Sequence, residues 1–251
     1  GGVSKGDCAT MNISTTRGDD PEAVNENRRR LATAIGVEES KMVYTNQTHT
    51  TNVVVVDETN YGKTMPETDG MIPNVPGLCA IRSKLQHPGL CLVTFYADCV
   101  PLYFVDPVKR VIGLSHSGWR GTVHKMAIAT VRKMQETFGC DPVDIRSVVG
   151  PSICQECYEV SEDVIDEFRA NYKETDWDSL FYRKENGKYQ LDLWRANEIN
   201  LLDAGVKAEH MAVTNVCTCC NHELLFSHRY TKGKRGNLSA FLALKEETKV
   251  E

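Results

Sequence analysis

The chain has 251 residues, of which 41% are hydrophobic and 25% charged, and its formal net charge is −5. This balance is that of a globular protein with a sizeable core, and the negative charge gives no general attraction to nucleic acid or to anionic membranes. No apolar run is long enough to cross a bilayer and the first residues do not resemble a signal peptide, so we expect a cytoplasmic protein.

Hydrophobic periodicity and turn residues predict the following elements along the chain. A helix is expected from the cap Asp20-Pro21 to the stop Gly36, and further helices at 121–138, from Ser161, and from Asp192 to Gly205. Strands are expected at 41–44, 51–56, 90–96, 100–105, 111–114, 145–149, 211–214 and 238–242. Because helices and strands mix without strict βαβ alternation, we predict an α+β fold, a single-domain mixed-sheet sandwich over residues 1–251.

A near-repeat interrupts this pattern. Pro76-Gly77-Leu78-Cys79 recurs as Pro88-Gly89-Leu90-Cys91. It is too short for a solenoid unit. We therefore interpret residues 77–89 as a surface insertion, and do not expect Cys79 or His87 to be ligands.

Cys99 and His116 each follow an apolar run, and His49 precedes one. Two imidazoles and a thiolate are a sound catalytic zinc set that leaves a fourth position for water or substrate. The same three residues could take copper, which outcompetes zinc at most nitrogen and sulfur sites. Cys99 with His116 could instead be a metal-free nucleophile–base pair, and a non-catalytic zinc-binding module is a further alternative.

The chain contains ten cysteines. Without a secretory signal, reduced thiols and metal ligands are favoured over a disulfide framework. Cys154 and Cys157 form a Cys-x-x-Cys pair, and a second group follows at Cys217, Cys219 and Cys220. These pairs could close a structural zinc site, but the gap of about sixty residues is far longer than in compact zinc modules.

Several common enzyme motifs are absent from the sequence. The His-x-Glu of zinc nucleobase deaminases, the paired His-x-His of copper oxidases, the glycine-rich phosphate loops and the Gly-x-Ser-x-Gly elbow do not occur. These absences disfavour each of those classes in its usual form.

Five motifs, in order along the chain, carry a specific resemblance. They are Thr45-Asn46-Gln47-Thr48-His49, Ala97-Asp98-Cys99-Val100-Pro101, His116-Ser117-Gly118-Trp119-Arg120-Gly121-Thr122, Gly150-Pro151-Ser152-Ile153 with Cys157-Tyr158-Glu159-Val160, and Phe226-Ser227-His228-Arg229. The chain resembles the YfiH family, also called the laccase-domain or polyphenol-oxidase-like family, over nearly its whole length.

The resemblance implies a zinc site of His49, Cys99 and His116, and purine nucleoside phosphorylase activity on adenosine, inosine, guanosine and methylthioadenosine with adenosine deaminase activity. Some family members carry the older label of copper-dependent polyphenol oxidase. The expected partners are thus a nucleoside and phosphate, with neither nucleic acid nor membrane.

The roles expected at the site follow from the same motifs. We expect Asp98 and Arg120 to act with Cys99 in proton transfer and anion contacts, and Gln47, Ser227 and Arg229 to bind substrate. A guanidinium such as that of Arg229 matches phosphate oxygens bidentately. The chain departs from the family pattern after Arg229, at Tyr230-Thr231, and again at Arg235-Gly236-Asn237.

Overall fold

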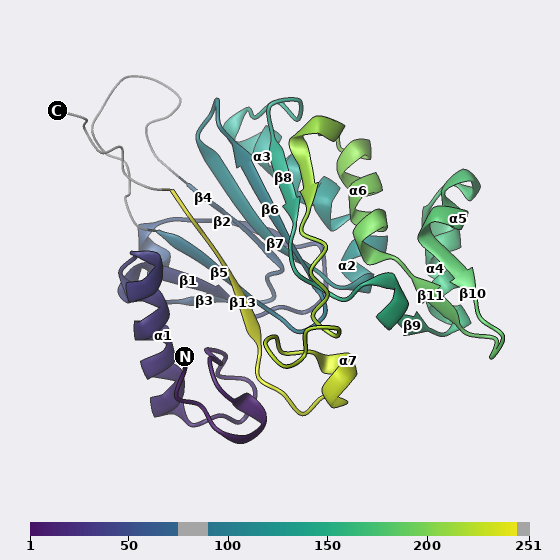
Figure 1. Cartoon of the computed structure of the whole chain (residues 1–251). Coiled ribbons are helices and arrows are strands. Elements are labelled where there is room, and N and C mark those ends of the chain that lie inside the picture. The colour runs from purple at the N-terminus through teal and green to yellow at the C-terminus, as the bar shows by residue number, and fades with distance from the viewer. Residues whose placement is uncertain (75–89, 245–251) are drawn as a thin grey trace.

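Two β-sheets stack face to face at the centre of the molecule (Figure 1). The computed structural model describes residues 1–74 and 90–244. The predicted insertion at 77–89, with Cys79 and His87, lies outside the described residues. Each sheet combines strands that lie far apart in the sequence.

The six-stranded sheet has mixed strand directions and the order β12–β8–β6–β7–β4–β2. Its strands are Val53–Val56 (β2), Gly70–Pro73 (β4), Val100–Asp106 (β6), Val111–Ser117 (β7), Arg146–Val149 (β8) and Met211–Val213 (β12). β6 and β7 pair antiparallel around the turn after Asp106, whose Oδ1 accepts hydrogen bonds from the N–H groups of Val108 and Lys109.

The four-stranded sheet has the order β13–β5–β1–β3. Its strands are Met42–Thr45 (β1), Thr64–Met65 (β3), Cys91–Tyr96 (β5) and Leu238–Ala243 (β13). Successive side chains point to opposite faces, as in any strand. Met42 and Tyr44 therefore pack in the cluster beneath α1 (Pro21–Ile35), whereas Val43 packs between the sheets.

Helices cover both outer faces, which gives four layers (Figure 1). α1 lies on the four-stranded sheet, while α3 (Met126–Phe138) and α6 (Leu193–Asp203) lie on the six-stranded sheet. α1 has the predicted ends, because the Asp20 side chain accepts a hydrogen bond from the Glu22 N–H and Gly36 stops the helix with a φ of 74°. The layers confirm the predicted α+β mixed-sheet sandwich.

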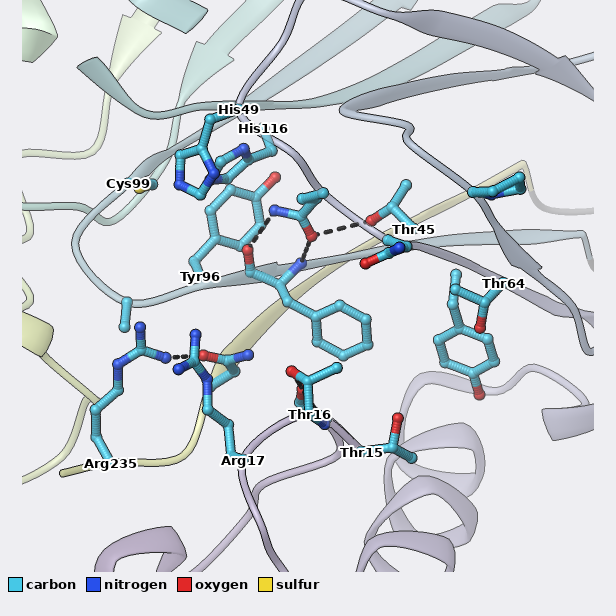
Figure 2. Close-up of a pocket in the computed structure, with 18 of the residues that line it drawn as sticks. Thr15, Thr16, Arg17, Thr45, His49, Thr64, Tyr96, Cys99, His116 and Arg235 are labelled. Atoms are coloured by element: carbon cyan, nitrogen blue, oxygen red, sulfur yellow. Dashed lines mark hydrogen bonds between the residues drawn. The ribbon is translucent and has the colours of Figure 1, made fainter. Parts of the chain in front are cut away.

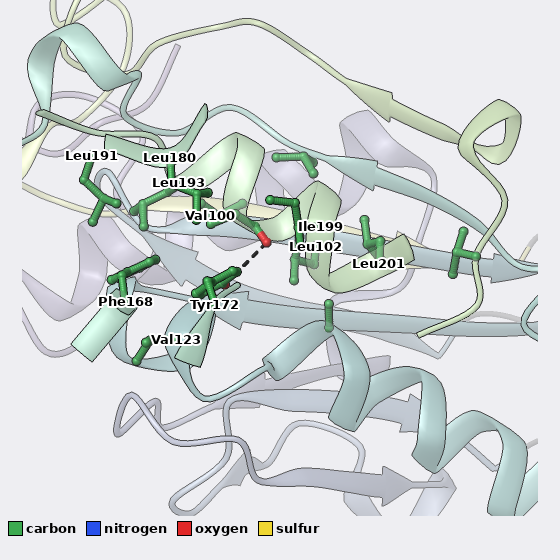
Figure 3. Packing of buried hydrophobic residues seen from close by; sticks show 14 of the residues in the cluster. Val100, Leu102, Val123, Phe168, Tyr172, Leu180, Leu191, Leu193, Ile199 and Leu201 are labelled. Atoms are coloured by element: carbon green, nitrogen blue, oxygen red, sulfur yellow. Dashed lines mark hydrogen bonds between the residues drawn. The ribbon is translucent and has the colours of Figure 1, made fainter. Parts of the chain in front are cut away.

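The largest apolar cluster lies between the six-stranded sheet and its helices (Figure 3). Leu102 and Phe104 of β6 are completely buried there, and Phe168 reaches the same cluster from α4 (Glu162–Asn171). The β6–β7 hairpin is thus packed on both faces, which makes it a rigid base for side chains at its ends.

Smaller elements flank the layers. A three-stranded sheet is formed by Glu159–Val160 (β9), Phe181–Arg183 (β10) and Tyr189–Leu191 (β11), beside α4 and Trp177–Leu180 (α5). The remaining helices are Trp119–Val123 (α2), His228–Thr231 (α7) and the 3-10 turns Gly6–Cys8, Glu39–Lys41, Glu58–Asn60, Gln155–Cys157, Glu174–Asp176 and Ala208–His210. No described helix is both long and apolar enough to cross a membrane.

The single helix predicted for 121–138 is wrong. The structure divides it into α2 and α3, because Lys125 between them adopts the left-handed region with a φ of 67°. Lys125 Nζ donates to Asn200 Oδ1 at 2.9 Å and lies 3.2 Å from the ring centroid of Tyr172. Both partners are distant from Lys125 in sequence. The hydrophobic periodicity of 121–138 therefore does not predict the division into α2 and α3.

Candidate metal centre

The structure brings together the three residues expected to hold a metal. Ligand atoms of His49, Cys99 and His116 lie within 4.8 Å of one another, and Figure 2 shows them converging at one end of a pocket. The two imidazole rings are nearly perpendicular, at 88°, with centroids 4.9 Å apart. Because Zn–N and Zn–S bonds are about 2.0–2.3 Å long, this spacing suits a single ion.

Strand register explains why Cys99 and His116 meet. In the β6–β7 pair, Pro101 lies opposite His116 and Val100 opposite Ser117. Cys99 directly precedes β6 and therefore lies beside His116. The structure extends β7 beyond the predicted 111–114, so His116 is inside the strand and only 3% exposed, whereas His49 lies on an exposed loop.

Asp69 holds the two histidines in place from behind. Its Oδ1 accepts hydrogen bonds from His116 Nδ1 at 2.9 Å and from the His49 N–H at 3.1 Å. Its Oδ2 accepts from the N–H groups of Thr48 at 3.2 Å and Thr50 at 2.9 Å. With Nδ1 donating to Asp69, His116 keeps Nε2 for a metal, the usual arrangement of histidine ligands.

The charges at the centre favour the metal-binding form of the cysteine. Burial alone would raise the pKa of Cys99, but the imidazoles of His116 and His49 outweigh it and lower the pKa to about 6. Burial alone would raise the pKa of Asp69 as well, but hydrogen bonds from His116 and Thr50 lower it to about 2. Cys99 is therefore a thiolate near neutral pH, and Asp69 is ionised.

His116 carries the compensating proton. Burial alone would lower the pKa of His116, but the Cys99 sulfur and the Asp69 carboxylate outweigh burial and raise this pKa to about 9. A metal ion must displace that proton, because only the neutral imidazole nitrogen is a ligand.

Gly118 leaves room for the three ligands. A Cβ at this position would lie 3.0 Å from His49 Cδ2 and 3.1 Å from Cys99 Sγ. These distances are shorter than ordinary van der Waals contact, so any larger residue would press on two ligands at once. The glycine of the His-Ser-Gly-Trp-Arg-Gly motif therefore has a steric role at the centre.

Two cavities meet at the metal centre. The first, of about 440 Å³, is the pocket of Figure 2, and Tyr44 and Phe95 are among its lining residues. The second, of about 410 Å³, contains Arg120 and Arg229. Both cavities are lined by Arg17, His49, Ala97, Cys99 and Arg235. A metal held here would thus lie beside two adjoining spaces.

Asp98, Arg120 and Arg229, which the sequence analysis expects at the site, all line the second cavity. Asp98 has a φ of 81°, and its Oδ1 and Oδ2 accept hydrogen bonds from Thr218 Oγ1 at 2.7 Å and the Arg229 N–H at 2.6 Å. The Arg120 guanidinium lies 4.2 Å from the Trp119 ring centroid, and that of Arg229 lies 5.2 Å from the Tyr158 ring centroid.

Gln47 and Ser227 have contacts of a different kind from those expected of substrate-binding residues. Gln47 lines the first cavity, but its Nε2 donates to Phe95 O and its Oε1 accepts from the Phe95 N–H, both at 2.7 Å. Ser227 is completely buried, and its Oγ accepts from the Tyr230 N–H at the start of α7. These contacts position β5 and α7, which carry Phe95 and Arg229.

Three residues at the site were not identified from the sequence. Asp69 belongs to a Thr-Asp-Gly sequence that is typical of an ordinary turn, and Arg17 lies in an irregular segment with no motif. Arg235 is 8% exposed, and its Nε has no hydrogen-bond partner among the described residues. Burial and the nearby Arg17 lower the pKa of Arg235 to about 10. The sequence shows that Arg235 departs from the family pattern, but it does not show that Arg235 lines both cavities.

Comparison with known proteins identifies the family of the chain. The family model described as "Multi-copper polyphenol oxidoreductase laccase" matches residues 1–245. The chain belongs to this laccase-domain, or YfiH, family.

Laccase-domain relatives with curated names are enzymes of nucleoside chemistry. "Purine nucleoside phosphorylase YlmD" of Geobacillus stearothermophilus is 36% identical over 248 residues, which cover 98% of this chain and 88% of that protein. "Adenosine deaminase RL5" of an unknown prokaryotic organism is 34% identical over 219 residues, 87% of this chain and 81% of that protein.

Solved structures of the family confirm the fold. YlmD from Geobacillus stearothermophilus matches with a TM-score of 0.89 and 34% identity, over 98% of this chain and 89% of that one. The Bacillus licheniformis hypothetical protein YfiH also matches with a TM-score of 0.89, at 31% identity, over 98% and 90% of the two chains.

Proposed function

We propose that the chain is a zinc-dependent purine nucleoside phosphorylase that also deaminates adenosine. The observation that carries the proposal is that His49 and Cys99 lie on the wall shared by the first cavity, here called the aromatic cavity, and the second, here called the arginine-rich cavity, while His116 lines the aromatic cavity beside them. Phosphorolysis breaks the bond between the ribose and the purine and forms a bond between the ribose and phosphate, so a site for the base and a site for the anion must lie on either side of the reacting sugar carbon. The names of the relatives support this choice.

The aromatic cavity suits the purine. The rings of Tyr44 and Phe95 are almost parallel, at 9°, with centroids 6.2 Å apart, and Asn46 and Thr45 line the same space. Aromatic faces stack on purine rings, and neighbouring amide and hydroxyl groups can hydrogen-bond to the edge of the base.

The arginine-rich cavity suits phosphate. Arg17, Arg120, Arg229 and Arg235 line it, and Asp98 is the acid among its described lining residues. Four guanidinium groups against one carboxylate leave the lining with an excess of positive charge, in a chain whose net charge is −5. Guanidinium groups bind phosphate oxygens through charge-assisted hydrogen bonds.

The donor set fits zinc, since three protein ligands of this kind leave an open position in catalytic zinc sites. When bound, the ion would supply Lewis-acid polarisation of a neighbouring oxygen. Arg120 and Arg229 would orient the anion, and Asp98, next to Cys99 in the chain, would hold or transfer a proton. The buried walls around His116 and Tyr96 would keep bulk water from the reacting bond.

Product analysis tests the proposal. Zinc-loaded protein should convert inosine and phosphate to hypoxanthine and ribose 1-phosphate, and adenosine without phosphate to inosine and ammonia. Zinc-loaded, folded protein that forms neither ribose 1-phosphate nor inosine would contradict it.

A pair of arginine variants separates phosphate binding from the rest of the site. Arg229→Gln should raise the KM for phosphate about tenfold or more, since a charge-assisted hydrogen bond contributes about 1.5–3 kcal/mol. It should change deamination of adenosine much less, because that reaction uses no phosphate. Arg169→Gln is the matched control, because Arg169 lies on α4 and pairs with Asp166 at the surface. An equal loss of both activities in Arg229→Gln would contradict the assigned role.

Assays on the purified protein also distinguish two alternative functions, a copper-dependent phenol oxidase and a metal-free Cys/His hydrolase. A copper-dependent phenol oxidase would need further copper ions for four-electron reduction of dioxygen, and the described histidines form only the cluster of His49 and His116 with Cys99. Oxidation of phenols by copper-loaded protein would favour it. A metal-free Cys/His hydrolase would stay active in chelator and lose activity in Cys99→Ser.

A further inference from the structure

A second cluster of four cysteines lies outside the proposed active site. Sγ atoms of Cys154, Cys157, Cys217 and Cys220 all lie within 4.8 Å of one another, although the two pairs are 63 residues apart. That separation argued against a shared site from the sequence alone. The structure overturns the argument, because residues 152 and 217 pair as neighbouring strands do.

The geometry points to a structural zinc site formed by these four cysteines, separate from the His49, Cys99 and His116 centre. Four thiolates about 2.3 Å from a tetrahedral zinc ion lie about 3.8 Å from one another. Cys157 Sγ and Cys220 Sγ are 3.5 Å apart, which is close to that spacing and far from the disulfide bond length of about 2.05 Å. All four cysteines are free thiols in the structure.

The backbone around the cluster stabilises a thiolate. Cys217 Sγ accepts hydrogen bonds from the N–H of Cys154 at 3.3 Å and from the N–H of Cys220 at 3.4 Å. Each pair has the Cys-x-x-Cys spacing of structural zinc ligands, and among the residues that the structure describes the group contains only sulfur ligands. A purely sulfur donor set selects zinc and other thiophilic metals over magnesium or calcium.

The four cysteines differ in burial, so the site is open to solvent on one side and fixed to the core on the other. Cys217 is buried, Cys154 and Cys157 are half-buried, and Cys220 is exposed. The cluster therefore touches the core on one side and solvent on the other, so an ion can enter without unfolding of the chain. Filling all four positions with protein ligands is typical of structural rather than catalytic zinc.

The site would join two segments that both contact Asp98. The Ile153 N–H donates to Asp98 O at 3.0 Å, and Thr218 Oγ1 donates to Asp98 Oδ1 at 2.7 Å. Ile153 directly precedes Cys154, and Thr218 directly follows Cys217. An ion bound by the cluster therefore joins the two segments that hold Asp98 beside Cys99. The four cysteines would then be positioning residues for the arginine-rich cavity.

Metal content of defined variants tests this inference independently of any activity. Protein purified with zinc and measured by elemental mass spectrometry should lose one zinc per chain in Cys157→Ser/Cys220→Ser. The double variant His49→Ala/His116→Ala should keep one zinc, whose X-ray absorption spectrum shows four sulfur ligands at about 2.3 Å. Cys219→Ser is the matched control, because Cys219 lies in the same turn but outside the cluster, and it should keep the wild-type zinc content.

The His49→Ala/His116→Ala variant leaves all four cysteines intact, so it tests the inference even if Cys157→Ser/Cys220→Ser does not fold. A zinc-free His49→Ala/His116→Ala chain, a spectrum with nitrogen or oxygen ligands, or a Cys157–Cys220 disulfide in the purified protein would each overturn the inference. Failure of the proposed nucleoside activity looks different, since the four-sulfur ion would remain in a chain that turns over no nucleoside.

Discussion

Asp69 Oδ1 lies 2.9 Å from His116 Nδ1, and the same carboxylate accepts hydrogen bonds from three successive backbone N–H groups, those of Thr48, His49 and Thr50. One buried charge thus sets both the ring orientation of one metal ligand and the loop conformation of another. The geometry of the metal centre therefore depends on this residue as well as on its own ligands.

Asp69→Asn should weaken zinc binding about 10- to 100-fold, the usual effect of losing a partner behind a histidine ligand. Competition with a chromophoric chelator measures it. Asp106→Asn is the control, because Asp106 is equally buried but caps the β6–β7 turn. Unchanged zinc affinity in Asp69→Asn would show that the histidines hold their positions without it.

Gly118→Ala should reduce zinc affinity about tenfold, because the added methyl group presses on His49 and Cys99 and a metal site tolerates displacements of only about 0.2 Å. Gly121→Ala serves as the comparison. Its Cβ would lie 3.6 Å from the nearest atoms, His116 O, Ser117 Oγ and Thr50 O, which is ordinary van der Waals contact. Equal affinities for the two variants, measured by the same titration, would count against the steric role of Gly118.

Thr218→Val should lower the free energy of unfolding by about 1–3 kcal/mol, since it leaves a buried carboxylate oxygen of Asp98 without its hydroxyl donor. Urea denaturation measures the loss. Thr94→Val removes a hydroxyl that hydrogen-bonds to the neutral Tyr96 OH at 2.7 Å, and should cost less, about 0.5–1.5 kcal/mol. The reverse order would mean that the Asp98 contact is not the stronger one.

Lys125 makes stability depend on pH in the alkaline range. Burial lowers the pKa of Lys125 to about 8 from the ordinary 10.5, against the opposing influence of Asp203 and Asp176. Between these values the unfolded chain binds the proton that the folded chain has released, so this residue makes stability rise with pH. Below pH 8 its contribution is constant and unfavourable.

The comparison of Lys125→Met with the parent chain isolates this contribution. The methionine variant should gain most relative to the parent at pH 7, and the gain should shrink by pH 10, as measured by urea denaturation at both pH values. Lys207→Met, at an exposed position, is the control. A gain that grows between pH 7 and pH 10 would reverse the assigned sign.

Local signals account for the elements that the sequence predicts well. Asp20-Pro21 and Gly36 predict both ends of α1. The apolar runs on either side of Cys99 predict β5 and β6, and the run before His116 predicts β7. The motifs of the family then identify the ligand trio. The four-layer sandwich follows, because strands that are apolar on both faces must be covered on both faces.

The remaining features depend on contacts between distant residues. The division between α2 and α3 accompanies contacts of Lys125 with Asn200 and Tyr172. Asp69 has the sequence context of an ordinary turn, and its role exists only once β4 lies beside β7. The two cysteine pairs are far apart along the chain and meet only through the pairing of residues 152 and 217.

The pairing of β13 with β5 has a consequence for biosynthesis. Leu238 lies opposite Tyr96, and Arg235 enters the cleft only a few residues before that strand. All three expected metal ligands precede residue 117, so a nascent chain emerging from the ribosome would hold its metal-binding residues long before Arg229 and Arg235 join them. Metal capture could therefore precede translation of the last strand, whereas turnover must wait for it.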